Sequence, residues 1–101
     1  MQPIITENRE KIAELCRAHH VRRLSVFGSA VRDDFDPERS DVDFLVEFEP
    51  FEASYARNFF SLLFSFDELF GREVDLLTDK YVRNPYLRKA IEEEKVTLYA
   101  A

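Results

Sequence analysis

Two aspartates, Asp41 and Asp43, open the apolar segment at residues 41–48, whose sequence is DVDFLVEF. Side chains two residues apart on a strand project from the same face, so these carboxylates would stand side by side, where like charges repel. A divalent cation relieves that repulsion, and Mg²⁺ typically takes one or two carboxylates together with phosphate oxygens. The alternative is a solvated strand end that binds nothing. The pair therefore marks a candidate metal site.

A third aspartate, Asp75, stands among apolar residues in the segment EVDLL at residues 73–77. If this segment is a strand beside residues 41–48, three carboxylates meet and can hold two cations, which orient the oxygens of an in-line phosphoryl displacement. Asp75 is then the candidate general base toward an acceptor hydroxyl. The alternative is an ordinary ion pair of Asp75 with Arg72 or Arg22.

Gly28 and Ser29 follow the apolar segment LSVF and precede a cation, Arg32. A glycine between a strand and a helix lets backbone N–H groups approach an anion, and the start of a helix favours negative charge. Ser29 would add a hydroxyl donor, and Arg32 would point at the same anion. These three residues are candidates for binding the phosphates of a nucleotide. The alternative is an ordinary turn followed by a surface arginine.

Helices and strands alternate along the chain, which predicts a single domain over residues 1–101 of the α+β or mixed α/β class, with a small sheet flanked by helices. A Gly after residue 70 and an Asn-Pro pair at 84–85 are typical of a helix end and a helix start. The last residues form a short strand or an extended tail. The expected helices cover Thr6 to about His20, 30–34, 52–70 and 85–94, and the expected strands cover 21–27, 41–48 and 73–78.

Composition excludes several classes of protein. The 101 residues are 46% hydrophobic and carry a net charge of −6, so the chain is not expected to bind nucleic acid directly. The one cysteine, Cys16, excludes an internal disulfide and a cysteine-based metal site. No apolar run approaches the ~20 residues of a membrane span, and the first ten residues, MQPIITENRE, are polar and contain no apolar signal core. We therefore expect a cytoplasmic protein that does not contact membranes. A core this small is compatible with a homo-oligomer or a permanent partner.

Two phenylalanines in the expected helix at 52–70 lie outside its apolar stripe. At ~100° per residue, most of the large apolar side chains share one face, whereas Phe60 and Phe64 fall outside it. This predicts a second surface that binds a partner protein. The alternative is that another part of this domain, such as the C-terminal helix, covers both rings.

The motifs together resemble a known superfamily. Phe27-Gly28-Ser29, the SDVD run that ends at Asp43, and Val74-Asp75-Leu76 are similar to the nucleotidyltransferases whose catalytic domain is like that of DNA polymerase β. The short length resembles the minimal nucleotidyltransferase (MNT) group, in particular MntA-type antitoxins of HEPN toxins. The resemblance covers nearly the whole chain. It departs in the spacer at 30–40, which is one residue longer than usual, and at Asp33, where many relatives have Gly.

The resemblance implies a polymerase β-like fold and a Mg²⁺-dependent transfer of AMP from ATP. It places the triphosphate near Gly28 and Ser29, the cations on Asp41 and Asp43, and the general base at Asp75. It also implies the acceptor, a hydroxyl, expected to be tyrosine, on an adjacently encoded HEPN toxin. One alternative is an antitoxin or binding module that neutralises its partner by occlusion without catalysis. A second alternative, a small-molecule nucleotidyltransferase, usually needs additional substrate-binding chain.

Overall fold

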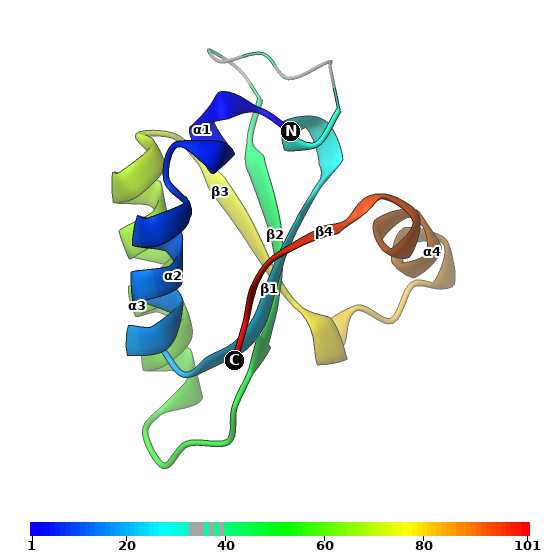
Figure 1. Cartoon of the computed structure of the whole chain (residues 1–101). Helices are drawn as coiled ribbons and strands as arrows, with labels where there is room; N and C mark the ends of the chain where they lie inside the picture. The colour runs from blue at the N-terminus through cyan, green and yellow to red at the C-terminus, as the bar shows by residue number, and fades with distance from the viewer. Residues whose placement is uncertain (33–35, 37, 39) are drawn as a thin grey trace.

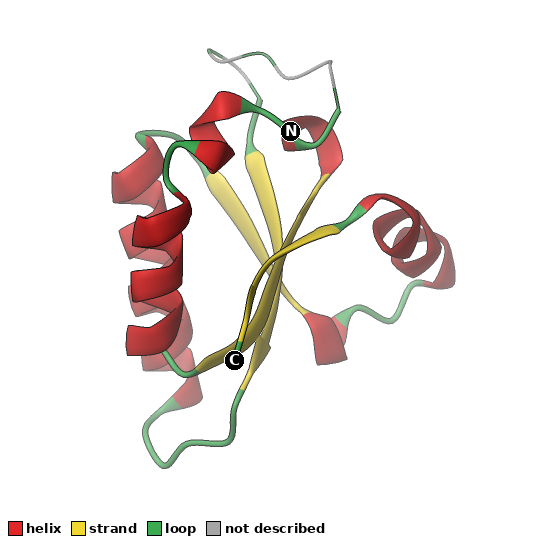
Figure 2. Ribbon diagram, in the orientation of Figure 1, coloured by secondary structure: helices red, strands yellow, loops and turns green. Residues whose placement is uncertain are grey.

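A computed structural model shows a four-stranded sheet with helices on both faces (Figures 1 and 2). The structure describes residues 1–32, 36, 38 and 40–101. The elements in chain order are α1 (Pro3–Thr6), α2 (Arg9–Ala18), β1 (Val21–Phe27), the 3₁₀ turn η1 (Gly28–Ala30), β2 (Val42–Phe48), α3 (Tyr55–Phe70), β3 (Val74–Thr78), the 3₁₀ turn η2 (Asp79–Tyr81), α4 (Pro85–Glu94) and β4 (Val96–Ala100).

The sheet is mixed and has the strand order β3-β2-β1-β4. β2 and β3 are parallel, and α3 provides the crossover that a parallel pair requires. β1 is antiparallel to both β2 and β4. This arrangement confirms the predicted small mixed sheet flanked by helices.

The main hydrophobic core lies between the sheet and the layer formed by α1, α2 and α3. β2 sends Val42, Phe44 and Val46 into this core, and all three are fully buried. The Phe44 ring packs against Phe66 of α3, with 5.0 Å between the ring centroids. Burying side chains of this size contributes roughly 1.5–3 kcal/mol each. This face of the sheet therefore supplies most of the stability.

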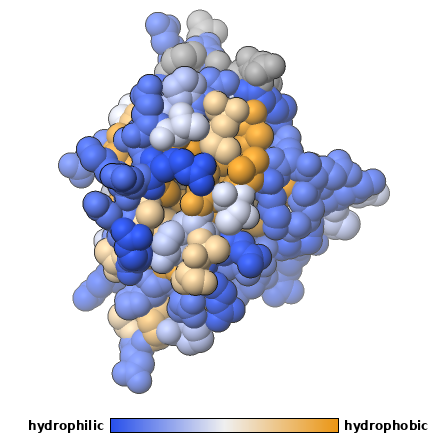
Figure 3. Space-filling model, in the orientation of Figure 1, coloured by the Kyte–Doolittle hydropathy of each residue, from blue (hydrophilic) through white to orange (hydrophobic). Residues whose placement is uncertain are grey.

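The opposite face of the sheet is covered by α4, which lies apart from the other helices (Figure 1). A smaller cluster forms there from Ile91 of α4 with Phe27 and Leu45 of the sheet. Figure 3 shows hydrophilic residues over α4, with hydrophobic residues gathered over the sheet between α4 and α2. None of the helices in the described part of the chain has the length and apolar character that crossing a bilayer requires.

The N-terminal helix differs from the prediction. The sequence suggested one helix from Thr6 to His20, whereas α1 ends at Thr6 and α2 begins at Arg9. The Asn8 side chain donates to the carbonyl of Ile4 at 2.8 Å, and such side-chain bonds compete with the helical backbone pattern. Ile5 is nevertheless fully buried in the main core.

The predicted helix ends are confirmed in α3 and α4. Gly71 ends α3 in the left-handed conformation, with φ of 64°. Asn84 caps α4 by accepting hydrogen bonds from the N–H groups of Tyr86 and Leu87. The C-terminal tail forms a strand, β4. The helix predicted at 30–34 is instead the turn η1, and residues 33 and 34 lie outside the described residues.

Candidate active site

The parallel pairing of β2 with β3 sets Asp43 directly opposite Asp75. The two carboxyl groups lie close enough for a hydrogen bond when one of them is protonated. Carboxylate oxygens of Asp41, Glu73 and Asp75 all lie within 4.8 Å of one another. The structure thus brings the three aspartates singled out in the sequence to one end of the sheet, on the face that carries α4.

Glu73 is a fourth acidic residue that the sequence interpretation did not assign to the site. It stands two residues before Asp75, the same spacing that drew attention to Asp41 and Asp43. Its backbone carbonyl accepts from the N–H of Val42 at 3.3 Å, which joins the starts of β2 and β3. The spacing was a usable signal, because residues two apart on extended chain share a face.

The arginines offered as alternative partners of Asp75 are engaged elsewhere. Arg72 donates to the carbonyl of Ser40 at 3.1 Å, and Arg22 lies 3.4 Å from Glu49. Among the described residues, no ion pair joins Asp75 to either arginine. Arg72 instead holds the chain that leads into Asp41.

The pKa of the Asp43 carboxyl is raised to about 7. Burial is the largest cause, followed by the hydrogen bond and charge of Asp75 and the charge of Asp41, while Arg32 acts in the opposite direction. Crowded carboxylates of this kind favour uptake of either a proton or a cation. The four acidic side chains offer oxygen ligands, which suits a hard cation such as Mg²⁺. They are Asp41, Asp43, Glu73 and Asp75. The residues therefore fit a divalent metal.

Gly28 is required beside Asp43 for steric reasons. Its φ is +75°, a conformation that residues with a Cβ rarely adopt. A Cβ on Gly28 would also lie only 2.5 Å from Oδ2 of Asp43. The glycine at the end of β1 therefore lets the backbone pass directly over the acidic cluster.

The phosphate-binding candidates lie beside the same carboxylates. The Gly28 N–H donates to Oε1 of Glu94, and Nη1 of Arg32 donates to Oε2 of the same residue, both at 2.9 Å. Ser29 is half-buried next to Gly28. Gly28 and Arg32 thus hold an anion, which is the carboxylate of Glu94 at the end of α4. The sequence interpretation had not identified Glu94. Asp33 lies outside the described part of the chain. So do residues 37 and 39 of the segment 36–39, where the extra spacer residue falls.

Phe60 and Phe64 lie on α3 and are exposed, with 51% and 65% of their surface accessible. Their ring centroids are 6.4 Å apart. The C-terminal helix α4 lies on the other face of the sheet and does not cover them (Figure 1). The rings therefore form an exposed aromatic pair, and contact with a partner protein stays a prediction.

Comparison of the chain with known proteins identifies its family. The family model described as a nucleotidyltransferase domain matches residues 9–98. The chain belongs to the nucleotidyltransferase domain family. A candidate protein adenylyltransferase of Methanocaldococcus jannaschii, MJ1379, is 32% identical over 94 residues, covering 85% of this chain and 93% of the relative. A second, MJ0435, is 37% identical over 92 residues, covering 91% and 95%.

Solved structures support membership in the minimal nucleotidyltransferase group. A candidate minimal nucleotidyltransferase superposes with a TM-score of 0.76 and 31% identity over 95% of both chains. A complex of a tri-AMPylated Shewanella oneidensis HEPN toxin with its MNT antitoxin gives a TM-score of 0.66 at 19% identity, covering 95% of this chain and 72% of that one. The second likeness shows a shared fold. The minimal nucleotidyltransferase described here is therefore an enzyme of the nucleotidyl-transfer class.

Proposed function

We propose that this nucleotidyltransferase moves AMP from ATP to a hydroxyl, expected to be tyrosine, of a HEPN toxin and acts as the antitoxin. The observation that carries the proposal is the cluster of four carboxylates beside Gly28 on a nucleotidyltransferase fold. Curated relatives carry names of protein adenylyltransferases. Structural neighbours include an AMPylated HEPN toxin with its antitoxin and a toxin–antitoxin complex with AMP-PNP.

Mg²⁺ is the proposed cofactor, with two ions expected. Asp41, Asp43 and Asp75 would hold the metal, and Glu73 lies within reach of the same position. A bound divalent cation neutralises phosphate charge and supports in-line displacement. The raised pKa of Asp43 supports this assignment, because these carboxylates repel one another when no cation is bound.

The remaining chemistry belongs to the chain's own groups. The Gly28 N–H, the Ser29 hydroxyl and the Arg32 guanidinium are the donors for phosphate oxygens. The acceptor oxygen forms a bond to the α-phosphorus, and the bond from that phosphorus to the bridging oxygen of the β-phosphate breaks. The electron pair of the broken bond leaves with pyrophosphate. Asp75, which is exposed at the edge of the cluster, accepts the proton of the acceptor hydroxyl.

Neutralisation by occlusion is the second candidate function. The exposed pair Phe60 and Phe64 favours it, because apolar rings on the surface are typical of protein interfaces. This pair lies on the helix layer opposite the face that carries the carboxylates. Binding to the partner and catalysis can therefore be tested separately. Cytoplasmic location and self-association of the chain stay predictions.

Intact-mass spectrometry of the chain with its adjacently encoded partner, ATP and Mg²⁺ tests the proposal. We expect adenylate-sized mass steps on the partner. The Asp41→Asn/Asp43→Asn variant should abolish them, whereas the matched variant Glu10→Gln/Glu14→Gln, which removes two exposed carboxylates from α2, should retain them. No mass step together with tight complex formation would favour occlusion over transfer.

A further inference from the structure

Two of the three groups proposed to donate to nucleotide phosphate are already engaged by a single side chain. The Gly28 N–H contacts one oxygen of Glu94, and the Arg32 guanidinium contacts the other, each at 2.9 Å. An Arg bound to a carboxylate through a charge-assisted bond uses the same N–H groups that bind phosphate. Glu94 is thus seated as a phosphate group would be. The Gly28 N–H and the Nη1 donor of Arg32 that Glu94 engages are therefore contested between Glu94 and a nucleotide phosphate.

Glu94 stands where its own helix does not favour it. It is the last residue of α4, and carboxylates near a helix C-terminus are disfavoured by the helix dipole. The bonds to Gly28 and Arg32 compensate for this effect. A phosphate that displaced Glu94 from these donors would therefore free its carboxylate to leave the unfavourable end of the helix dipole.

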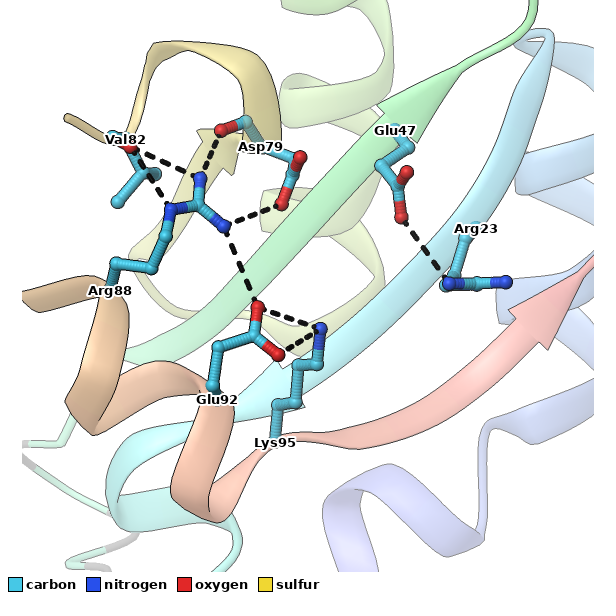
Figure 4. Close-up of polar contacts among 7 residues, drawn as sticks. All are labelled: Arg23, Glu47, Asp79, Val82, Arg88, Glu92 and Lys95. Carbon is cyan, nitrogen blue, oxygen red and sulfur yellow. Dashed lines mark hydrogen bonds and ion pairs between the residues drawn. The ribbon is translucent and has the colours of Figure 1, made fainter.

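The body of α4 is held by other contacts (Figure 4). Arg88 donates to the carbonyls of Asp79 and Val82, at 2.6 and 3.1 Å, which fixes the first half of the helix to η2. Ile91 is buried against the sheet. The Glu94 side chain is 28% exposed and Arg32 is 50% exposed. Glu94 can therefore turn into solvent while α4 stays docked.

We propose that Glu94 is an internal competitor of the nucleotide, occupying the phosphate donors at η1 until a triphosphate displaces it. The inference rests on the proposed function, since it presumes that these donors bind ATP. In a chain whose site is partly occupied by its own side chain, the apparent affinity for ligand is the intrinsic affinity multiplied by the fraction of molecules whose site is free. Glu94 thereby sets the ATP concentration at which the enzyme becomes loaded.

Titration calorimetry of the full chain with ATP and Mg²⁺ tests this competition. The Glu94→Ala variant should bind ATP roughly two- to fivefold more tightly than the wild type, the scale expected for removing a partly exposed ion pair. The Glu94→Gln variant should fall between them. The matched control is Glu93→Gln, because Glu93 is 67% exposed and faces Lys89 instead. In NMR spectra of the same proteins without ATP, the Gly28 amide resonance should shift in the Glu94 variants and stay in place in the control.

Each outcome decides between the two claims. Unchanged or weaker ATP binding by Glu94→Ala, with normal binding by the wild type, would overturn the competitor role and leave the proposed function standing. An unmoved Gly28 resonance in Glu94→Ala would overturn the contact itself. Failure of every variant to bind ATP would overturn the proposed function, and the competitor role with it.

Discussion

Alternate residues of β2 point to opposite faces of the sheet, one facing the main core and the other facing the acidic cluster. Val42 and Phe44 are fully buried beneath three helices, whereas Asp43 between them lies half-buried on the face covered by α4. One face packs large apolar side chains in the main core, and the other gathers repelling carboxylates at its start, beside the smaller apolar cluster of Leu45 and Ile91. The alternation of the strand thus separates the side chains of the main core from the carboxylates. Substitutions on the two faces should therefore fail in different ways.

The largest expected effect is on the buried face. Phe44→Ala should lower the free energy of unfolding by about 3–5 kcal/mol, because it removes a fully buried ring and leaves a cavity. The matched change Phe64→Ala removes the same ring from a side chain that is 65% exposed and should cost less than about 0.5 kcal/mol. Urea unfolding measures both. Equal losses would contradict the assignment of the two rings.

Two glycines with the same backbone conformation differ in what surrounds them. Gly28 and Gly71 both have positive φ, so alanine at either position costs about 1 kcal/mol of backbone strain. Only at Gly28 would the new Cβ meet another group, Asp43, whereas nothing lies within 4 Å at Gly71. Gly28→Ala should therefore lose about 1–3 kcal/mol of stability and also lose ATP binding. Gly71→Ala should keep its ATP affinity in the same calorimetric titration, and a loss there would argue against a local clash.

The pKa of Asp43 gives the site face its own pH dependence. Because this pKa is raised from 3.8 to about 7, the folded chain holds a proton that the unfolded chain releases. The resulting stability is present at low pH and is lost as the pH rises through about 7. With chelator present, Asp43→Asn should raise the melting temperature at about pH 8.5 and have less effect at about pH 5. An effect that is independent of pH would show that Asp43 does not titrate in this range.

The smallest effect on folding is expected at the exposed aromatic pair. Phe60→Asp and Phe64→Asp should change the free energy of unfolding by less than about 0.5 kcal/mol each, because both rings face solvent. Complex formation with the partner should nevertheless be lost, as measured by size-exclusion chromatography of the mixture. Unfolding of the isolated variants would place these rings in the domain's own core.

Short-range features were predictable from the sequence, because they depend on neighbours along the chain. The caps at Asn84 and Gly71 have the residue types that such ends require. The alternation of Asp43 with Phe44 shows which residues share a face. The break between α1 and α2 was not predictable from periodicity, since it involves a side-chain bond from Asn8 to Ile4. Glu73 stands two residues before Asp75, so the same spacing rule places both side chains on one face.

The family resemblance, the carboxylate pair at the start of β2 and the preceding glycine all follow from residue types and their spacing along the chain. Which of these groups meet depends on how the helices and strands pack. The parallel register of β2 and β3 sets Asp43 opposite Asp75, and this pairing is fixed by packing beneath α3. The contact of Glu94 with Arg32 joins residues 62 positions apart. No local propensity encodes such a contact, because it exists only once α4 has docked on the sheet.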